Sequence, residues 1–169
     1  MTAHRDDSIA ILHDQFPTLG GAERVVIEAA RVLDAPVYTA YVDPEVTVPS
    51  DVTVHELHGR RYNGVLNRAL PDSGGLADQL RSWSLAFDLS DVPALHGYET
   101  VLESNHASKH YTPTDRQTVV NYAHTLPQYY YNLYHYALER LRSPVPTTPV
   151  KAYVKLCRVL DKEANDYVD

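Results

Sequence analysis

The chain has 169 residues, enough for one domain with a proper core and too few for two ordinary domains. Its 15 basic and 22 acidic residues give a net charge of −7, which argues against a nucleic-acid-binding protein. No apolar run approaches the ~18 residues needed to cross a bilayer, and a single cysteine, Cys157, excludes an internal disulfide framework. We therefore expect a cytoplasmic location.

The first half of the chain alternates strand-like and helix-like stretches. Residues 8–13 form a short apolar run typical of a buried strand, and a loop with Pro17 and the pair Gly20-Gly21 follows. Residues 37–42 and 52–57 are rich in β-branched residues and predict two further strands. Between the Gly20-Gly21 loop and residue 37, helical spacing predicts a helix that ends at Asp34-Ala35-Pro36. Its apolar face is made of Ala22, Val25, Val26, Ala29 and Leu33.

The second half continues this alternation. A weaker helical stretch covers residues 60–70, and residues 99–104 and 117–122 predict strands. A tyrosine-rich helix is expected from Pro127 to about Arg142, and a last helix from about Val150 carries Cys157 on its apolar stripe. A further helix is predicted after Gly74-Gly75 from the spacing of Leu76, Leu80, Trp83 and Phe87.

Five strands with intervening helices predict an α/β fold, a Rossmann-like doubly wound and mainly parallel sheet, with residues 1–169 as one domain. Ligands of such folds bind at the carboxyl ends of the strands. Three segments are expected there: residues 13–21, 104–110 and 124–128.

The first of these segments contains Gly20 and Gly21 immediately before a helix. Glycines at a helix start let the backbone approach a ligand, and the free N–H groups there favour an anion. No Gly-Lys-Ser/Thr follows, and the spacing is not that of a dinucleotide-binding fingerprint. Taken without context, a glycine pair before a helix is more often simply a tight turn.

His124 begins the third segment. It lies just after the strand expected over residues 117–122 and just before a helix expected from Pro127. An imidazole at a sheet edge can hydrogen-bond a sugar hydroxyl or a developing charge, whereas the purely structural alternative is a histidine that caps the helix. In the second segment, Lys109 can meet a phosphate or remain merely solvated. His106 and His110 are four residues apart but lack a third ligand, so we expect no metal.

Three stretches carry a resemblance to a known family. The strand, loop and Gly-Gly-Ala-Glu-Arg-Val-Val of residues 20–26 resemble the opening of family 4 glycosyltransferases of the GT-B fold. Residues 119–132 are similar to that family's strand followed by His-Thr-Pro-Pro-Arg-Tyr, with departures at Leu126 and Gln128. A third segment, residues 103–110, resembles the family's strand-to-helix segment with its small residues and lysine.

The resemblance implies a transferase that moves a sugar from a nucleotide-sugar donor to a glycan, lipid-linked or small-molecule acceptor, commonly without a metal and with retention. By position, His124 takes the catalytic role. The loss of the family's arginine at Gln128 removes a cation from that helix. The residues that the match implies in donor or acceptor binding are Gly20, Gly21, Asn105, Lys109, Thr125 and Gln128.

The resemblance covers only the N-terminal, acceptor-side half of such an enzyme, because the family's sugar-nucleotide-binding domain would follow Asp169. We accordingly expect little transfer by the chain alone, and association with a separate C-terminal polypeptide or with a second copy. A lipid-linked acceptor would bring the protein to the inner membrane face. The alternative interpretation is a non-catalytic Rossmann-like module that binds a ligand or a partner.

Overall fold

The computed structural model describes residues 8–57, 84–122 and 124. All of them lie in one compact unit, Met1–His124, and Thr125–Asp169 forms a second. The helices expected over residues 60–70, 127–142 and from residue 150 fall outside the described residues. These helices, and the assignment of residues 1–169 to one domain, stay predictions.

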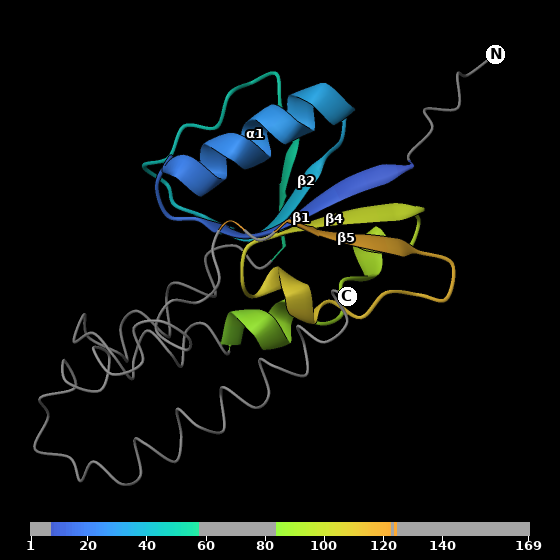
Figure 1. Ribbon diagram of the computed structural model, residues 1–169. Helices are drawn as coiled ribbons and strands as arrows, with labels where there is room; N and C mark the ends of the chain where they lie inside the picture. The colour runs from blue at the N-terminus through green and yellow to red at the C-terminus, as the bar shows by residue number, and fades with distance from the viewer. Residues whose placement is uncertain (1–7, 58–83, 123, 125–169) are drawn as a thin grey trace, which may run out of the picture. The chain divides into compact units, whose positions relative to one another are not determined.

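Five parallel strands form a single sheet in the order β3-β2-β1-β4-β5 (Figure 1). This architecture confirms the predicted α/β, Rossmann-like parallel sheet. The first strand begins one residue later and ends three residues later than expected, and the third is shorter, whereas the second has the predicted bounds. The strands are β1 (Ile9–Phe16), β2 (Val37–Val42), β3 (Val54–Glu56), β4 (Thr100–Ser104) and β5 (Thr118–Tyr122).

Helical segments cover both faces of the sheet (Figure 1). Helix α1 (Gly21–Leu33) packs on one face through Val26, Ile27 and Ala30, against Ile11 and Val37 of the central strands. Residues 84–89 and the short 3₁₀ helices η1 (Pro93–Leu95) and η2 (Ser108–His110) lie over the other face. The buried residues on that second face are Ala10, Leu12, Tyr38, Ala40, Leu85, Ala86, Leu89, Val92, Leu95, Val101, Ala107 and Tyr111.

The predicted apolar face of α1 is partly wrong. Val25 and Leu33 are 41% and 40% exposed, whereas Ile27 and Ala30 are buried. Three apolar residues in succession, Val25 to Ile27, satisfy either stripe at helical spacing, so the packing of α1 on the sheet decides between them.

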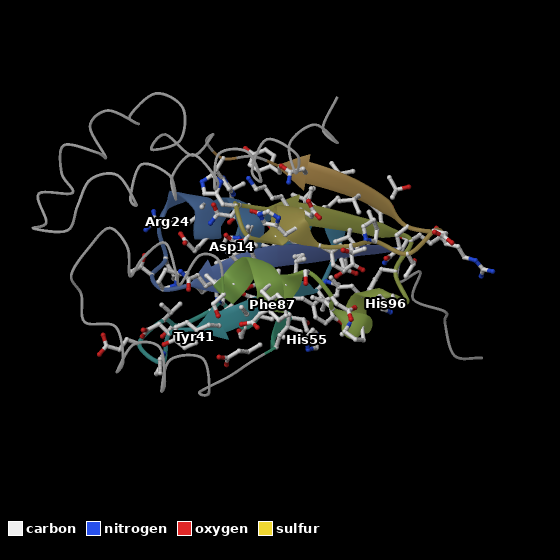
Figure 2. The ribbon with its side chains drawn as sticks, turned by 90° about the horizontal axis from the view of Figure 1, so that it is seen from below. Asp14, Arg24, Tyr41, His55, Phe87 and His96 are labelled. Atoms are coloured by element: carbon white, nitrogen blue, oxygen red, sulfur yellow. The ribbon has the colours of Figure 1, made fainter. Side chains whose placement is uncertain are left out.

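The apolar stripe expected through Phe87 also differs from the structure. Phe87 is 81% exposed (Figure 2), and the buried residues of this helical turn are Leu85, Ala86 and Leu89. Leu85 and Leu89 are four residues apart and share a face that leaves Phe87 outside. Helical spacing identified a helix here but placed its buried face wrongly.

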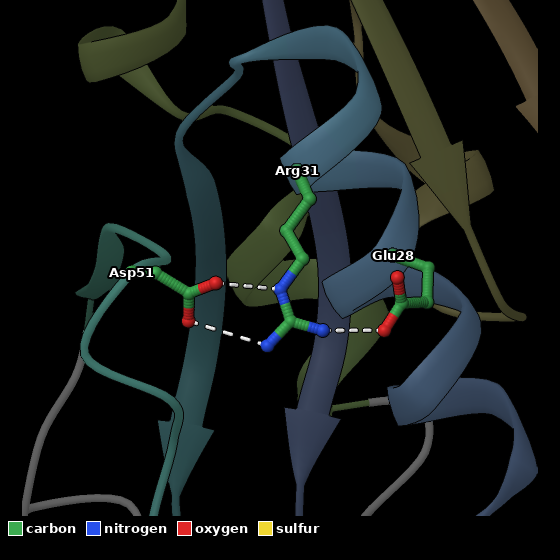
Figure 3. A network of polar contacts seen from close by, with 3 residues as sticks. All are labelled: Glu28, Arg31 and Asp51. Carbon is green, nitrogen blue, oxygen red and sulfur yellow. Dashed lines mark hydrogen bonds and ion pairs between the residues drawn. The ribbon is translucent and has the colours of Figure 1, made fainter.

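A charged network ties α1 to the connection before β3 (Figure 3). Arg31 donates to Asp51 from Nε at 2.7 Å and from Nη2 at 3.2 Å, and its Nη1 contacts Glu28. All three side chains are substantially exposed, so water screens the attraction and the network orients the connection more than it stabilises the fold.

None of the helices within residues 8–57 and 84–124 is long and apolar enough to span a membrane.

Candidate functional site at the carboxyl edge of the sheet

The sheet changes winding direction between β1 and β4. From β1 the strand order runs through β2 to β3 on one side, and through β4 to β5 on the other. In open parallel sheets the crevice outside the carboxyl ends of the two strands at this switch point is the usual ligand site. The residues that end β1, β4 and β5 are therefore the ones whose chemistry matters.

The strand registers place three polar side chains side by side. His13 of β1 pairs with Ser104 of β4, and Ser104 pairs with Tyr122 of β5. His13 and Ser104 are each two residues beyond Ile11 and Leu102, which pack in the core under α1, so all four lie on the α1 face. This face of the switch point thus carries an imidazole, a hydroxyl and a phenol in a row.

Ser104 also fixes His124, the residue predicted to be catalytic. Its Oγ lies 2.8 Å from His124 Nε2, and the Tyr122 ring meets the imidazole edge-on at 4.9 Å. Ser104 is only 2% exposed. Its hydroxyl is therefore suited to orienting the His124 ring rather than to attacking a substrate itself.

His13 lies fully buried in the middle of the sheet. Its Nδ1 is 3.2 Å from the Ser104 carbonyl oxygen, which can only accept a hydrogen bond, so Nδ1 carries the proton. Burial lowers the pKa of His13, although the nearby Asp14 charge opposes that change, and the ring is neutral near pH 7. Nε2 is therefore a lone-pair acceptor, and it has no hydrogen-bond partner among the described residues.

Asp14 points to the opposite face of β1 and binds the loop after β4. Its Oδ2 accepts from the backbone N–H groups of His106 at 3.1 Å and Ala107 at 2.9 Å, and its Oδ1 accepts from Ser108 at 2.7 Å. Burial raises the pKa of the Asp14 carboxyl, and the three N–H donors partly oppose this. The carboxylate acts as a buried cap that holds the start of η2 against β1.

Glu103 is a second buried carboxyl group next to Asp14. It lies on the same face as Leu12, with which it pairs, and accepts a hydrogen bond from Asn121 Nδ2 at 3.0 Å. The pKa of Glu103 is raised to about 7. Burial is the largest cause and the charge of Asp14 adds to it, whereas the hydrogen bond from Asn121 opposes it. This group therefore changes its charge in the physiological pH range.

Asn105 adopts a left-handed backbone conformation, with φ 94°, between β4 and η2. Asparagine tolerates this region better than residues with a larger Cβ branch, and glycine tolerates it best. The backbone therefore supplies a structural reason for the residue type at this position. Lys109, the other predicted binding residue of this segment, lies in η2 and is partly buried.

Substituting Asn105 tests whether its backbone or its side chain matters. We expect Asn105→Ala to lower the free energy of unfolding by about 1–2 kcal/mol because of the positive φ, and Asn105→Gly to remain within about 0.5 kcal/mol of the parent. Urea unfolding of both variants measures this. Equal destabilisation by both substitutions would assign the effect to the amide side chain instead.

The two predicted glycines begin α1. Gly20 is the N-cap residue, with an extended backbone and no side-chain cap, and Gly21 is the first helical residue. A Cβ at Gly20 would lie 2.8 Å from Oε2 of Glu23, a largely buried side chain, whereas nothing lies within 4 Å of a Cβ at Gly21. The backbone of Gly20 therefore lies close to the Glu23 side chain, whereas the position that a Cβ of Gly21 would occupy is open.

The structure brings most of the predicted site residues to one edge of the sheet. Gly20 and Gly21 follow β1, Asn105 and Lys109 follow β4, and His124 follows β5. Thr125 and Gln128 lie outside the described residues. Sequence reasoning did not single out His13, Asp14, Glu103 or Ser104. The available signal was the presence of polar residues within otherwise apolar strands, in Leu12-His13-Asp14 and Leu102-Glu103-Ser104.

Within the part of the chain that the structure describes, no group of three or more histidine, cysteine or acidic side chains could hold a metal ion. No protein-family model, no curated protein and no solved structure matches the chain. The candidate site therefore rests on geometry and on residue chemistry.

Proposed function

We propose that this chain is the acceptor-side domain of a glycosyltransferase, and that its carboxyl sheet edge binds the hydroxyl groups of a sugar. One observation carries the proposal: β1, β4 and β5 are adjacent and parallel, so the Gly20-Gly21 loop and His124 follow strands that end at the same edge of the sheet. In the family that the sequence resembles, the corresponding loop approaches the donor diphosphate and the acceptor, and the corresponding histidine faces the transferred sugar or the acceptor.

His124 is the proposed catalytic residue. Ser104 holds its Nε2, which leaves Nδ1 to contact a hydroxyl of the transferred sugar or of the acceptor. The leaving nucleoside diphosphate gains negative charge as the anomeric carbon becomes oxocarbenium-like. That charge would be stabilised by a second, sugar-nucleotide-binding domain, so the chain alone binds saccharides but transfers none.

Binding of small saccharides to the purified chain tests the proposal. We expect methyl glycosides or nucleotide sugars to bind saturably in ligand-observed NMR, and His124→Gln to weaken that binding about tenfold through loss of an oriented hydrogen bond. A matched control is His96→Gln. His96 is an exposed histidine that follows η1 and so precedes β4, away from the carboxyl edge (Figure 2).

Three results would contradict the proposal. One is that no saccharide or nucleotide sugar binds at millimolar concentration. A second is that His96→Gln and His124→Gln weaken binding equally. The third is sugar transfer by the purified chain with no second polypeptide added, measured by mass spectrometry of the acceptor.

A further inference from the structure

His13 is an unusual residue for the centre of a parallel sheet. It lies on β1 between β2 and β4 and is fully buried, where apolar side chains normally occur. Among the described residues, every other buried side-chain nitrogen or oxygen atom has a hydrogen-bond partner, and Nε2 of His13 has none. Leaving such an atom unpaired costs free energy, so its retention requires an explanation.

The tautomer of His13 defines what Nε2 can bind. Nδ1 donates to the Ser104 carbonyl oxygen, and the buried ring is neutral, so Nε2 offers only a lone pair. A partner must therefore bring an O–H or N–H group. A carboxylate, a sulfate ion or the diphosphate linkage of a nucleotide sugar has no proton to donate at neutral pH, so its oxygen atoms would face the lone pair of Nε2 without a hydrogen bond.

The surroundings of His13 lie at the edge proposed to bind ligand. The Phe16 ring meets the imidazole edge-on at 4.9 Å, and His124 shares Ser104 with it. His124 is close enough that a positive charge on it would lower the pKa of His13 further. Asp14, the nearby carboxylate, lies on the opposite face of β1 and is already bound by three N–H groups.

We propose that Nε2 of His13 accepts a hydrogen bond from a hydroxyl group of the bound ligand, beside His124. This edge would then select a neutral, hydroxyl-rich molecule such as a sugar ring, and not the phosphate groups of a nucleotide. The inference rests on the proposed function and names the part of the substrate that His13 recognises beside the carboxyl end of β4. Because Nε2 is buried, the hydroxyl reaches it when the side chains around it, Phe16 among them, shift on binding.

Two substitutions at His13 separate its two nitrogen atoms. His13→Asn keeps an amide donor near the Nδ1 position and removes the acceptor at Nε2, whereas His13→Gln places an amide oxygen near Nε2. With methyl α-glucopyranoside, methyl α-mannopyranoside and myo-inositol as probes, we expect His13→Asn to bind about tenfold more weakly and His13→Gln to bind within about threefold of the parent.

The imidazole nitrogen resonances of the unsubstituted chain give a readout that does not depend on the folding of any variant. We expect ¹⁵N NMR to show an unprotonated Nε2 on His13 in the free chain. Its resonance should shift toward that of a hydrogen-bonded nitrogen on addition of a bound probe, and stay in place with sulfate, an anion that has no O–H group to donate.

The results separate this inference from the proposed function. Saccharide binding that depends on His124 while His13→Asn binds normally would overturn the inference alone and assign Nε2 to a buried water. A shift of the Nε2 resonance with sulfate but with no polyol would also overturn it. If none of the glycosides or polyols binds, the inference and the proposed function fail together.

Discussion

Replacing Asp14 with alanine is expected to destabilise the domain by about 4 kcal/mol. The substitution leaves the backbone N–H groups of His106, Ala107 and Ser108 without their acceptor. The Ala107 and Ser108 side chains are buried, so water replaces the carboxylate poorly. Urea unfolding measures the loss, and amide hydrogen exchange should quicken at these three residues before it does in β4.

The exposed Asp91 supplies a control for this prediction. Its side chain is 76% exposed. Among the described residues its one ion-pair contact is with His96, at 3.5 Å. Asp91→Ala should therefore remain within about 0.5 kcal/mol of the parent. If Asp14→Ala is no more destabilising than Asp91→Ala, the three hydrogen bonds do not hold the loop as described.

The second large effect is a pH-dependent stabilisation by Glu103→Gln. Burial raises the pKa of Glu103 in the folded chain to about 7 from an ordinary 4.5, so the folded state holds this proton more tightly than the unfolded state does. Its favourable contribution is complete below about pH 4.5 and is lost as the pH rises through 7. At pH 8 the charged carboxylate is destabilising by about 3 kcal/mol, which the neutral amide avoids.

Glutamine suits this test because its amide oxygen can still accept from Asn121 Nδ2. The free energy of unfolding, measured from pH 4.5 to 8.5 in urea, should fall with pH in the parent and much less in Glu103→Gln. Glu99→Gln, at an exposed position just before β4, controls for the removal of one carboxylate. Parallel pH profiles for the parent and Glu103→Gln would show that this carboxyl is not the titrating group.

The sheet could be predicted because its strands are short apolar runs separated by turn residues. The segment 37–42 is all β-branched, aromatic or alanine, and it forms β2 without change. The apolar run of residues 8–13 predicts a first strand that ends at His13. In the structure the strand continues to Phe16, since His13 and Asp14 find buried partners in the segment 104–108.

The candidate site was predictable only as far as topology allows. Parallel strands bring their carboxyl ends together, so the sequence could place the Gly20 loop and His124 at one edge. The contacts of Ser104 with His13 and His124, and of Asp14 with the η2 loop, depend on the strand register and on residues 20 to 94 positions apart. Local periodicity contains no information about such pairs.

The central position of β1 has a consequence for how the chain folds during synthesis. Its partner β2 follows after a single helix, but its other partner, β4, is made only after residues 43–99. Until then β1 presents one unpaired edge, and His13 and Asp14 lack the acceptor and donors that β4 and its loop provide. Because so many contacts join distant parts of the chain, folding should be slow for a domain of this size, and the nascent N-terminal segment should depend on chaperones.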